Sequence, residues 1–170
     1  GVHSVEQPTR YDETQHRWNY SMSNAEEDTL PPAGARTITY RGGYKYQLVD
    51  DYQVMIEIKP AAFILTPYIR LDTDGLLSIV AGYAWDGPSG PAIDTKNFMR
   101  GSLVHDALYQ LMRERHLDPE TQREPADRIL QRICLEDGMS SLRAYWVYVG
   151  VRFGGGPAAT EAEKPPSKAP

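Results

Sequence analysis

The residues best suited to chemistry lie between Trp85 and Asp127. His105 and Tyr109 are four positions apart, so they share one face if this segment is helical. Asp127 stands one turn before the apolar Leu130 on a later segment, so its side chain should lean inward. A carboxylate bonded to one imidazole nitrogen fixes the tautomer and strengthens the other nitrogen as a base. His105, Asp127 and Tyr109 therefore predict a catalytic set in which the histidine takes a proton from water.

Two further carboxylates and a turn could hold a metal ion beside this set. Asp106 and Asp86 supply carboxylate oxygens. The adjoining turn supplies backbone carbonyl groups through Trp85, Gly87, Ser89 and Gly90. Such a set suits calcium better than zinc, because calcium takes about six to eight oxygen ligands. A cation there would stabilise the oxyanion formed from a carbonyl group.

Each of these residues also has an ordinary structural interpretation. His105 and Tyr109 could be core residues with satisfied polar atoms. Asp127 could be an early-helix carboxylate favoured by the helix dipole. Asp106 could be a solvated helix residue, and Asp86 a turn residue. The spacing of all five together favours a site.

The elements that must position these residues begin with β-rich segments in residues 36–84. Turn-forming pairs separate them at Gly42-Gly43, Asp50-Asp51 and Asp74-Gly75. The expected strands are residues 37–40, 44–49, 54–58, 63–71 and 76–81. Consecutive hairpins predict an antiparallel meander of about five strands. The loop from Trp85 to Pro91 is expected to end the sheet.

Three helices are expected after the sheet, which gives an α+β fold. The first runs from about Thr95 to Glu114 and carries apolar residues at helical spacing. The second is expected to begin at Pro125, a favoured first-turn residue, and to end at Gly138. The third begins near Ser140 or Ser141 and ends at Gly154-Gly155-Gly156. Gly101, one turn before His105, either leaves room for a ligand or allows close backbone packing.

Composition indicates a single domain with polar ends. The chain is 41% hydrophobic and has a formal net charge of -5, so it has no bulk attraction to nucleic acid. No apolar run approaches the ~18 residues of a transmembrane helix. We expect one domain over residues 36–156, a polar irregular arm at 1–35 and a disordered Pro/Ala-rich tail at 157–170. Its one cysteine, Cys134, excludes an internal disulfide and is interpreted as a buried apolar residue.

The order of three motifs resembles a family of uncharacterised bacteriophage and prophage proteins. The motifs are Gly82-Tyr83-Ala84-Trp85-Asp86-Gly87-Pro88-Ser89, then His105-Asp106-Ala107-Leu108-Tyr109, then Pro125-Ala126-Asp127. The similarity covers roughly residues 40–155. It implies a phage origin, a place in the virion or the host cytoplasm, and other phage structural proteins as partners. It implies no particular activity.

A second resemblance is mechanistic. The loop Gly87-Pro88-Ser89-Gly90, the segment His105-Asp106-Ala107-Leu108-Tyr109 and the pair Ala126-Asp127 are similar to motifs of the phospholipases A2, especially the disulfide-free parvoviral kind. The resemblance implies that His105 is the base activating water, that Asp106 is a calcium ligand and that Asp127 and Tyr109 hold the histidine. It implies a lipid or cell-envelope ester as the substrate. The longer stretch from Pro91 to His105 and the prolines in the loop depart from that pattern.

Two functions are therefore expected from the sequence. One is a calcium-dependent hydrolase. The other is a virion or assembly protein in which the same polar residues fix the packing of the helices. A metal phosphohydrolase is disfavoured, because the only upstream histidines are His3 and His16 in the arm. A serine hydrolase is disfavoured too, because neither Ser89 nor Ser102 lies in a nucleophile elbow.

Overall fold

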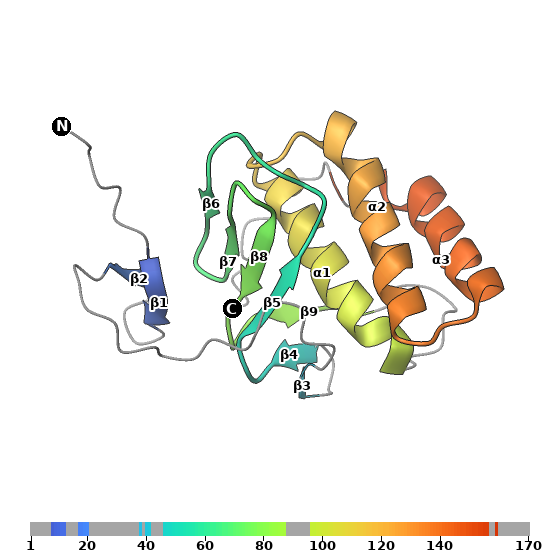
Figure 1. Ribbon diagram of the computed structural model, residues 1–170, viewed down its shortest axis with the longest axis horizontal. Coiled ribbons are helices and arrows are strands. Elements are labelled where there is room, and N and C mark those ends of the chain that lie inside the picture. Colours follow the sequence, from blue (N-terminus) through green and yellow to red (C-terminus); the bar gives the residue numbers. More distant parts are fainter. Residues whose placement is uncertain are drawn as a thin grey trace, which may run out of the picture.

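The computed structural model describes residues 8–12, 17–20, 38, 40–41, 46–87, 96–156 and 159 (Figure 1). Short strands come first and three helices follow, which confirms the α+β class. The strands are β1 (Pro8–Asp12), β2 (Arg17–Tyr20), β3 (Tyr40–Arg41), β4 (Tyr46–Leu48), β5 (Tyr52–Met55), β6 (Ile64–Leu65), β7 (Ile69–Leu71), β8 (Leu76–Ile79) and β9 (Ala84–Trp85). The helices are α1 (Lys96–Arg113), α2 (Pro119–Glu136) and α3 (Ser141–Gly154).

All strand pairs are antiparallel, but they form separate sheets instead of one meander. One sheet has the order β5-β8-β7-β6, a second has β3-β4-β9, and β1 pairs with β2. The hairpin predicted at Asp50-Asp51 is therefore wrong, because β4 and β5 lie in different sheets. The hairpin at Asp72–Gly75 is confirmed by the pairing of β7 with β8.

Two other strand predictions need correction. The segment 63–71 is two strands, β6 and β7, which turn back on each other and pair. Pro67 lies in that turn, where its missing N–H costs the sheet nothing. Trp85 was assigned to a loop, but it lies on β9 and is the register partner of Tyr46 on β4.

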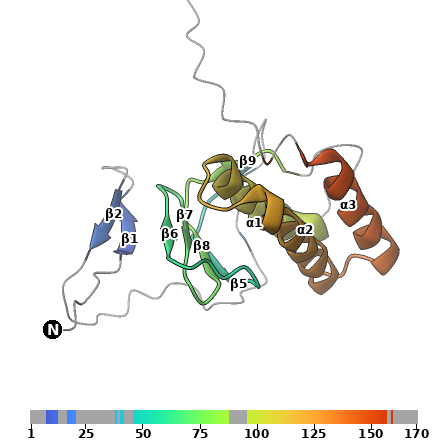
Figure 2. The ribbon, with the colours of Figure 1, turned by 90° about the horizontal axis from the view of Figure 1, so that it is seen from above.

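The helices stack beside the four-stranded sheet in the order α1, α2, α3. Figure 2 shows this arrangement from above, with α1 nearest the sheet and α3 on the far side of α2. The main core joins the inner face of the sheet to α1 and α2, through residues such as Ile69, Leu77, Leu103, Leu108 and Ile133. A smaller cluster between α1, α2 and α3 contains Phe98, Leu130, Cys134 and Ala144. Cys134 is buried, as predicted.

The helix α2 begins earlier than the sequence prediction. It starts at Pro119, and the side chain of Asp118 accepts a hydrogen bond of 3.0 Å from the Glu120 N–H. Asp-Pro-Glu is a complete start signal, with a cap, a first-turn proline and an acidic residue that favours the helix dipole. The later Pro125 lies inside the helix, so the prediction that α2 begins there is wrong.

The helix α3 is the most weakly buried of the three. It begins at Ser141, as predicted, and Ser140 caps it. Ala144 is its only fully buried residue, with Val147 and Val151 partly buried against α2. Its outward face exposes Leu142, Tyr145, Trp146 and Phe153. Across the described residues, no helix is both long and apolar enough to cross a membrane.

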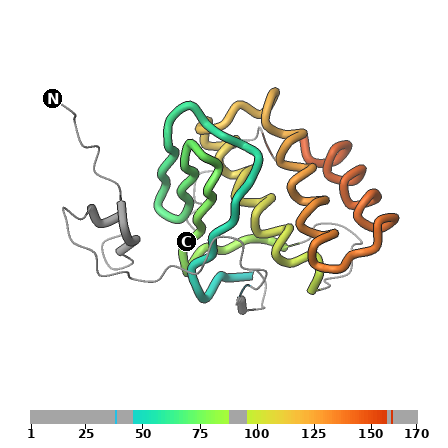
Figure 3. Tube along the Cα trace, in the orientation of Figure 1, coloured from blue at the N-terminus to red at the C-terminus, as the bar shows by residue number. Residues whose placement is uncertain are grey.

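The chain ends differ in part from their predictions. Strands β1 and β2 lie within the arm that was predicted to be irregular. Ala159, in the predicted tail, is buried in the main core, while residues 160–170 lie outside the described part of the chain. Figure 3 traces the segment between β5 and β6 as it runs beside α2, where Glu57 pairs with Arg132.

Candidate functional site

Three of the predicted site residues meet between α1 and α2. The His105 Nε2 atom lies 2.8 Å from Asp127 Oδ1, and the Tyr109 hydroxyl donates to the same oxygen at 2.7 Å. The side chain of Asp127 is fully buried, and His105 is 8% exposed. Two donors on one carboxylate oxygen fix both its position and its ionised state. The convergence of His105, Tyr109 and Asp127 is therefore observed in the structure.

Helical spacing positions these side chains. His105 and Tyr109 are one turn apart on α1, and their rings are in contact, with centroids 4.1 Å apart and planes tilted by 37°. Asp127 lies in the middle of α2, where its neighbours Ala126 and Leu130 are buried. The interpretation of Asp127 as an early-helix carboxylate is therefore wrong, because α2 begins two turns before it. Its orientation comes from the packing of α2 on α1.

Gly101 explains how the two helices come so close. A Cβ atom at this position would lie 2.9 Å from Leu130 Cδ1 and 3.0 Å from Cys134 Sγ. The space beside Gly101 is therefore filled by α2 and holds no room for a ligand. Of the two roles considered for this glycine, the structure supports close packing.

An arginine on α3, which the sequence interpretation did not include in the site, completes the network. The Arg152 Nη1 atom lies 3.0 Å from the second Asp127 oxygen, Oδ2. Arg123 on α2 donates through Nη2 to the backbone carbonyls of Val151 and Arg152, and so holds the end of α3 in place. The one signal for Arg152 in the sequence is a basic residue in the last turn of a helix. That feature is too common to single it out.

Gly155, just after α3, contributes by lacking a side chain. A Cβ atom there would lie 2.8 Å from the Tyr109 hydroxyl. The chain therefore passes directly over the hydroxyl that bonds Asp127. A side chain at this position would disturb that hydrogen bond.

The network shifts the pKa values of its members in opposite directions. Burial alone would lower the pKa of His105, but the carboxylates of Asp106 and Asp127 outweigh it and raise that pKa above its ordinary value. Burial would raise the pKa of Asp127, but His105, Tyr109 and Arg152 together lower it. Burial and the neighbouring Asp127 carboxylate raise the pKa of the Tyr109 hydroxyl. Asp127 is therefore a carboxylate and Tyr109 a neutral donor across the neutral pH range.

The second imidazole nitrogen lies on the side of Asp106. His105 Nδ1 is 4.0 Å from Asp106 Oδ1, beyond the reach of a direct hydrogen bond. The Asp106 side chain is 31% exposed, whereas the His105 side chain is only 10% exposed. The carboxylates of Asp106 and Asp127 therefore face the two different nitrogens of the His105 ring.

The predicted turn is only partly within the described residues. Trp85 is buried and donates from Nε1 to Ser102 Oγ at 3.0 Å, and Ser102 in turn donates to the Met99 carbonyl at 2.9 Å. Gly87 has a φ of 75° and lies against the Tyr46 ring. Ser89 and Gly90 lie outside the described residues. Ser102 is thus occupied structurally, which agrees with its rejection as a nucleophile.

The carboxylates predicted to bind calcium do not complete a metal site by themselves. Asp86 is exposed at the end of β9, and Asp106 is half-buried on α1. Among the residues that the structure describes, no group of three or more His, Cys, Asp or Glu side chains could hold a metal ion. Calcium binds about six to eight oxygens, so these two carboxylates do not suffice.

Comparisons with protein-family models, with curated proteins and with solved structures find no match to this chain. A function for it has to be argued from the geometry and chemistry of the site itself.

Proposed function

We propose that the protein is a hydrolase in which His105 activates water for attack on an ester. The single observation that supports it is the 2.8 Å contact between His105 Nε2 and Asp127 Oδ1, with the other ring nitrogen 4.0 Å from the partly exposed carboxylate of Asp106. A buried carboxylate behind an imidazole is the arrangement that makes a histidine an oriented general base.

The proposed reaction follows from the roles of the three residues. His105 Nδ1 takes a proton from water as the water oxygen bonds to the ester carbonyl carbon. The Asp127 carboxylate stabilises the resulting imidazolium. The tetrahedral intermediate then expels the alcohol, which receives the proton back from His105. Tyr109 and Arg152 keep Asp127 ionised and fixed throughout.

A divalent cation would supply charge stabilisation for the carbonyl oxyanion. Asp106 and Asp86 are the carboxylates that could contribute to its binding, but the described residues form no complete site, so no step is assigned to it. The motif resemblance supports a lipid or cell-envelope ester as the substrate, and calcium as the cation to test. The resemblance to phage and prophage proteins supports a phage origin, with a place in the virion or the host cytoplasm.

The test is hydrolysis of a panel of aryl esters and phospholipid vesicles, with calcium and with a chelator. The His105→Ala variant should lose activity by about 10²–10⁴-fold, the usual contribution of a general base. His116→Ala is the matched control, because His116 is an exposed histidine beyond the end of α1. Equal rates for the two variants, or no hydrolysis of any ester by the native chain, would reject this function.

A second candidate is an assembly protein of a phage particle. The specific observation that favours it is the outward face of α3, where Leu142 is 71% exposed and Phe153 is 88% exposed. An apolar face of this kind is typical of a surface covered by another protein. In this case the buried network serves to hold α3 in place through Arg152. Two results together would favour this candidate. The native chain would hydrolyse no ester, and the Asp127→Ala variant would have a lower thermal stability than the native chain.

A further inference from the structure

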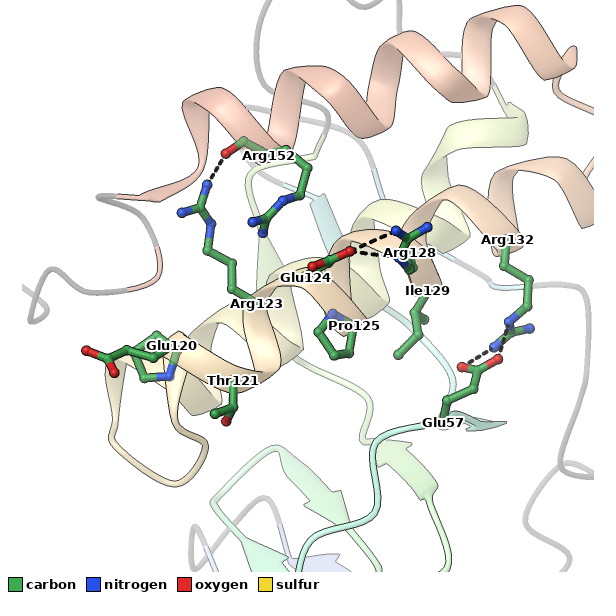
Figure 4. A pocket seen from close by; sticks show the side chains of 11 residues that line it. Glu57, Glu120, Thr121, Arg123, Glu124, Pro125, Arg128, Ile129, Arg132 and Arg152 are labelled. Carbon is green, nitrogen blue, oxygen red and sulfur yellow. Dashed lines mark hydrogen bonds and ion pairs between the residues drawn. The ribbon is translucent and has the colours of Figure 1, made fainter.

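A cavity lies on the side of α2 that faces away from His105. Its volume is about 770 Å³, and its lining comes from α2 between Pro119 and Arg132, from Glu57 after β5 and from Arg152 on α3. Figure 4 shows Arg123 and Arg152 between α2 and α3, and the pair of Glu57 and Arg132 on the other side of α2. This volume is in the range of pockets that bind small organic ligands.

Arginine dominates the charge of this cavity. Four arginines line it, Arg123, Arg128, Arg132 and Arg152, against three glutamates, Glu57, Glu120 and Glu124. Arg132 is offset by Glu57 and Glu136, so the excess lies at the end near α3. There, three arginines, Arg123, Arg128 and Arg152, meet two carboxylates, Glu124 and Asp127, which leaves one positive charge more. The whole chain has a net charge of -5, so this local excess runs against the average charge of the molecule.

Ion pairs neutralise one end of the cavity more completely than the other. Arg132 pairs with Glu57 at 2.9 Å and with Glu136 at 2.5 Å. At the other end, the guanidinium groups of Arg123 and Arg152 lie near each other (Figure 4). Asp127 already pairs with Arg152, whereas the structure gives Arg123 no ion pair among the described residues, so an anion beside Arg123 would offset its charge.

Arg123 also has an unused donor. Its Nη2 atom donates to the carbonyls of Val151 and Arg152, but its Nε atom is buried and has no hydrogen-bond partner among the described residues. Buried donors are almost always paired in folded proteins, so an unpaired one indicates a missing acceptor.

Arg128 can join these two side chains. It is 62% exposed and is held by Glu124, one turn earlier on α2, at 2.8 Å. Exposed pairs of this kind are weak, so Arg128 can exchange Glu124 for a stronger acceptor. In the structure its guanidinium group also lies over the Tyr148 ring, 5.3 Å from the centroid. A move of this side chain toward Arg123 and Arg152 would complete a set of three guanidinium groups at this end of the cavity.

We propose that this cavity binds a phosphate group through Arg123, Arg128 and Arg152. Guanidinium groups bind phosphate oxygens in paired hydrogen bonds, and a phosphate group offers enough acceptor oxygens for three of them. The remaining volume accommodates the organic part of a phosphate ester. The phosphate proposal does not rest on the proposed hydrolase, but the cavity shares Arg152 with the His105–Asp127 network.

Isothermal titration of the full chain with inorganic phosphate, at matched ionic strength in chloride, tests the site. Arg128→Gln removes an exposed side chain, so the variant should fold normally. It should weaken phosphate binding by at least about tenfold, the effect of losing a charged hydrogen bond. Arg143→Gln is the matched control, because Arg143 lies on α3 but does not line the cavity. Its affinity should equal that of the native chain.

Two further ligands identify the source of the phosphate. Glycerol phosphate represents soluble esters, and phosphatidylglycerol vesicles, compared with phosphatidylcholine vesicles, represent anionic lipid headgroups. Binding of either that is weakened by Arg128→Gln and unaffected by Arg143→Gln supports the site and assigns its source. Absence of binding to all the phosphate probes, or equal weakening by the two variants, would overturn it.

Discussion

Two buried polar clusters lie on α1, one around Arg100 and one around His105, and they differ in how completely their central side chain is bonded. Arg100 is 3% exposed, and its Nε, Nη1 and Nη2 atoms bond Asp137, Tyr52 and Glu136 at 3.0, 3.2 and 2.8 Å. This cluster ties α1 to the end of α2 and to β5. The Nε2 atom of His105 is bonded to Asp127, while its Nδ1 atom lies 4.0 Å from Asp106, beyond hydrogen-bond distance.

The difference lies in which group can change its protonation. An arginine keeps its charge at any pH that a protein tolerates, and Arg100 has a partner for each nitrogen. An imidazole changes charge near neutral pH, and the carboxylate behind it controls that change. Burial beside carboxylates therefore does not by itself identify a reactive site. A reactive site is better indicated by a titratable ring that has a fixed partner on one nitrogen and no direct hydrogen bond on the other.

The largest expected effect separates the two clusters by stability. Asp127→Ala leaves His105, Tyr109 and Arg152 without their shared acceptor, and should lower the free energy of unfolding by ~3–5 kcal/mol. Arg100→Met should cost less, ~1–3 kcal/mol, because the charges it leaves are nearer to solvent and Glu136 keeps Arg132. Urea unfolding at pH 7 measures both. A larger loss in Arg100→Met would show that Arg100 holds the more important cluster.

A smaller effect tests the packing that brings His105 and Asp127 together. Gly101→Ala gains about 1 kcal/mol of helix propensity but forces Leu130 and Cys134 away from α1. We expect a net loss of ~1–3 kcal/mol, as for other overpacked positions. Gly150→Ala on α3 is the control, because nothing lies within 4 Å of its Cβ position. It should gain roughly 0.5–1 kcal/mol. A gain in both variants would contradict close packing at Gly101.

The third prediction concerns pH. The pKa of His105 is raised on folding, so its stabilising contribution is complete below about pH 6.5 and is lost as pH rises through the higher folded pKa. The pKa of Asp127 is lowered, so its contribution is present above about pH 4 and is lost as pH falls through the lower folded pKa. Thermal stability should therefore be greatest between these limits.

The His105→Gln variant isolates the histidine's part of that profile. It should remove the decline on the alkaline side, while His116→Gln, at an exposed position, should keep it. Melting temperatures measured from pH 3 to pH 9, roughly the span over which these two groups titrate, give the comparison. Identical alkaline declines in the native chain and in His105→Gln would show that another group is responsible.

Patterns within one segment of the chain could be predicted from the sequence. The apolar stripe of α1 and the start of α3 near Ser140 or Ser141 are local signals, and the structure confirms both. The pairing of His105 with Asp127 was also predictable, because each residue faces inward on its own helix. The start of α2 was missed because Pro125 looked like a first-turn proline, although Asp118-Pro119-Glu120 gives the stronger signal.

Contacts between distant segments could not be predicted in this way. The partition of β4 and β5 into two sheets depends on tertiary pairing, since β4 pairs with β9 far along the chain. Arg100 lies within the apolar stripe of α1. A charged residue at such a position indicates a buried ion pair, but the pattern does not identify its partners. Arg152 joins the site only because α3 packs beside α2, which no periodicity reveals.

The shallow burial of α3 has a consequence for how the molecule opens. With Ala144 as its only fully buried residue, α3 depends on the ionic link between Arg152 and Asp127 for part of its attachment. Local opening begins where few apolar contacts must break, so backbone amides of α3 should exchange with solvent deuterium before those of α1. Each opening removes Arg152 from Asp127, so detachment of this helix and uncovering of the central carboxylate are one event.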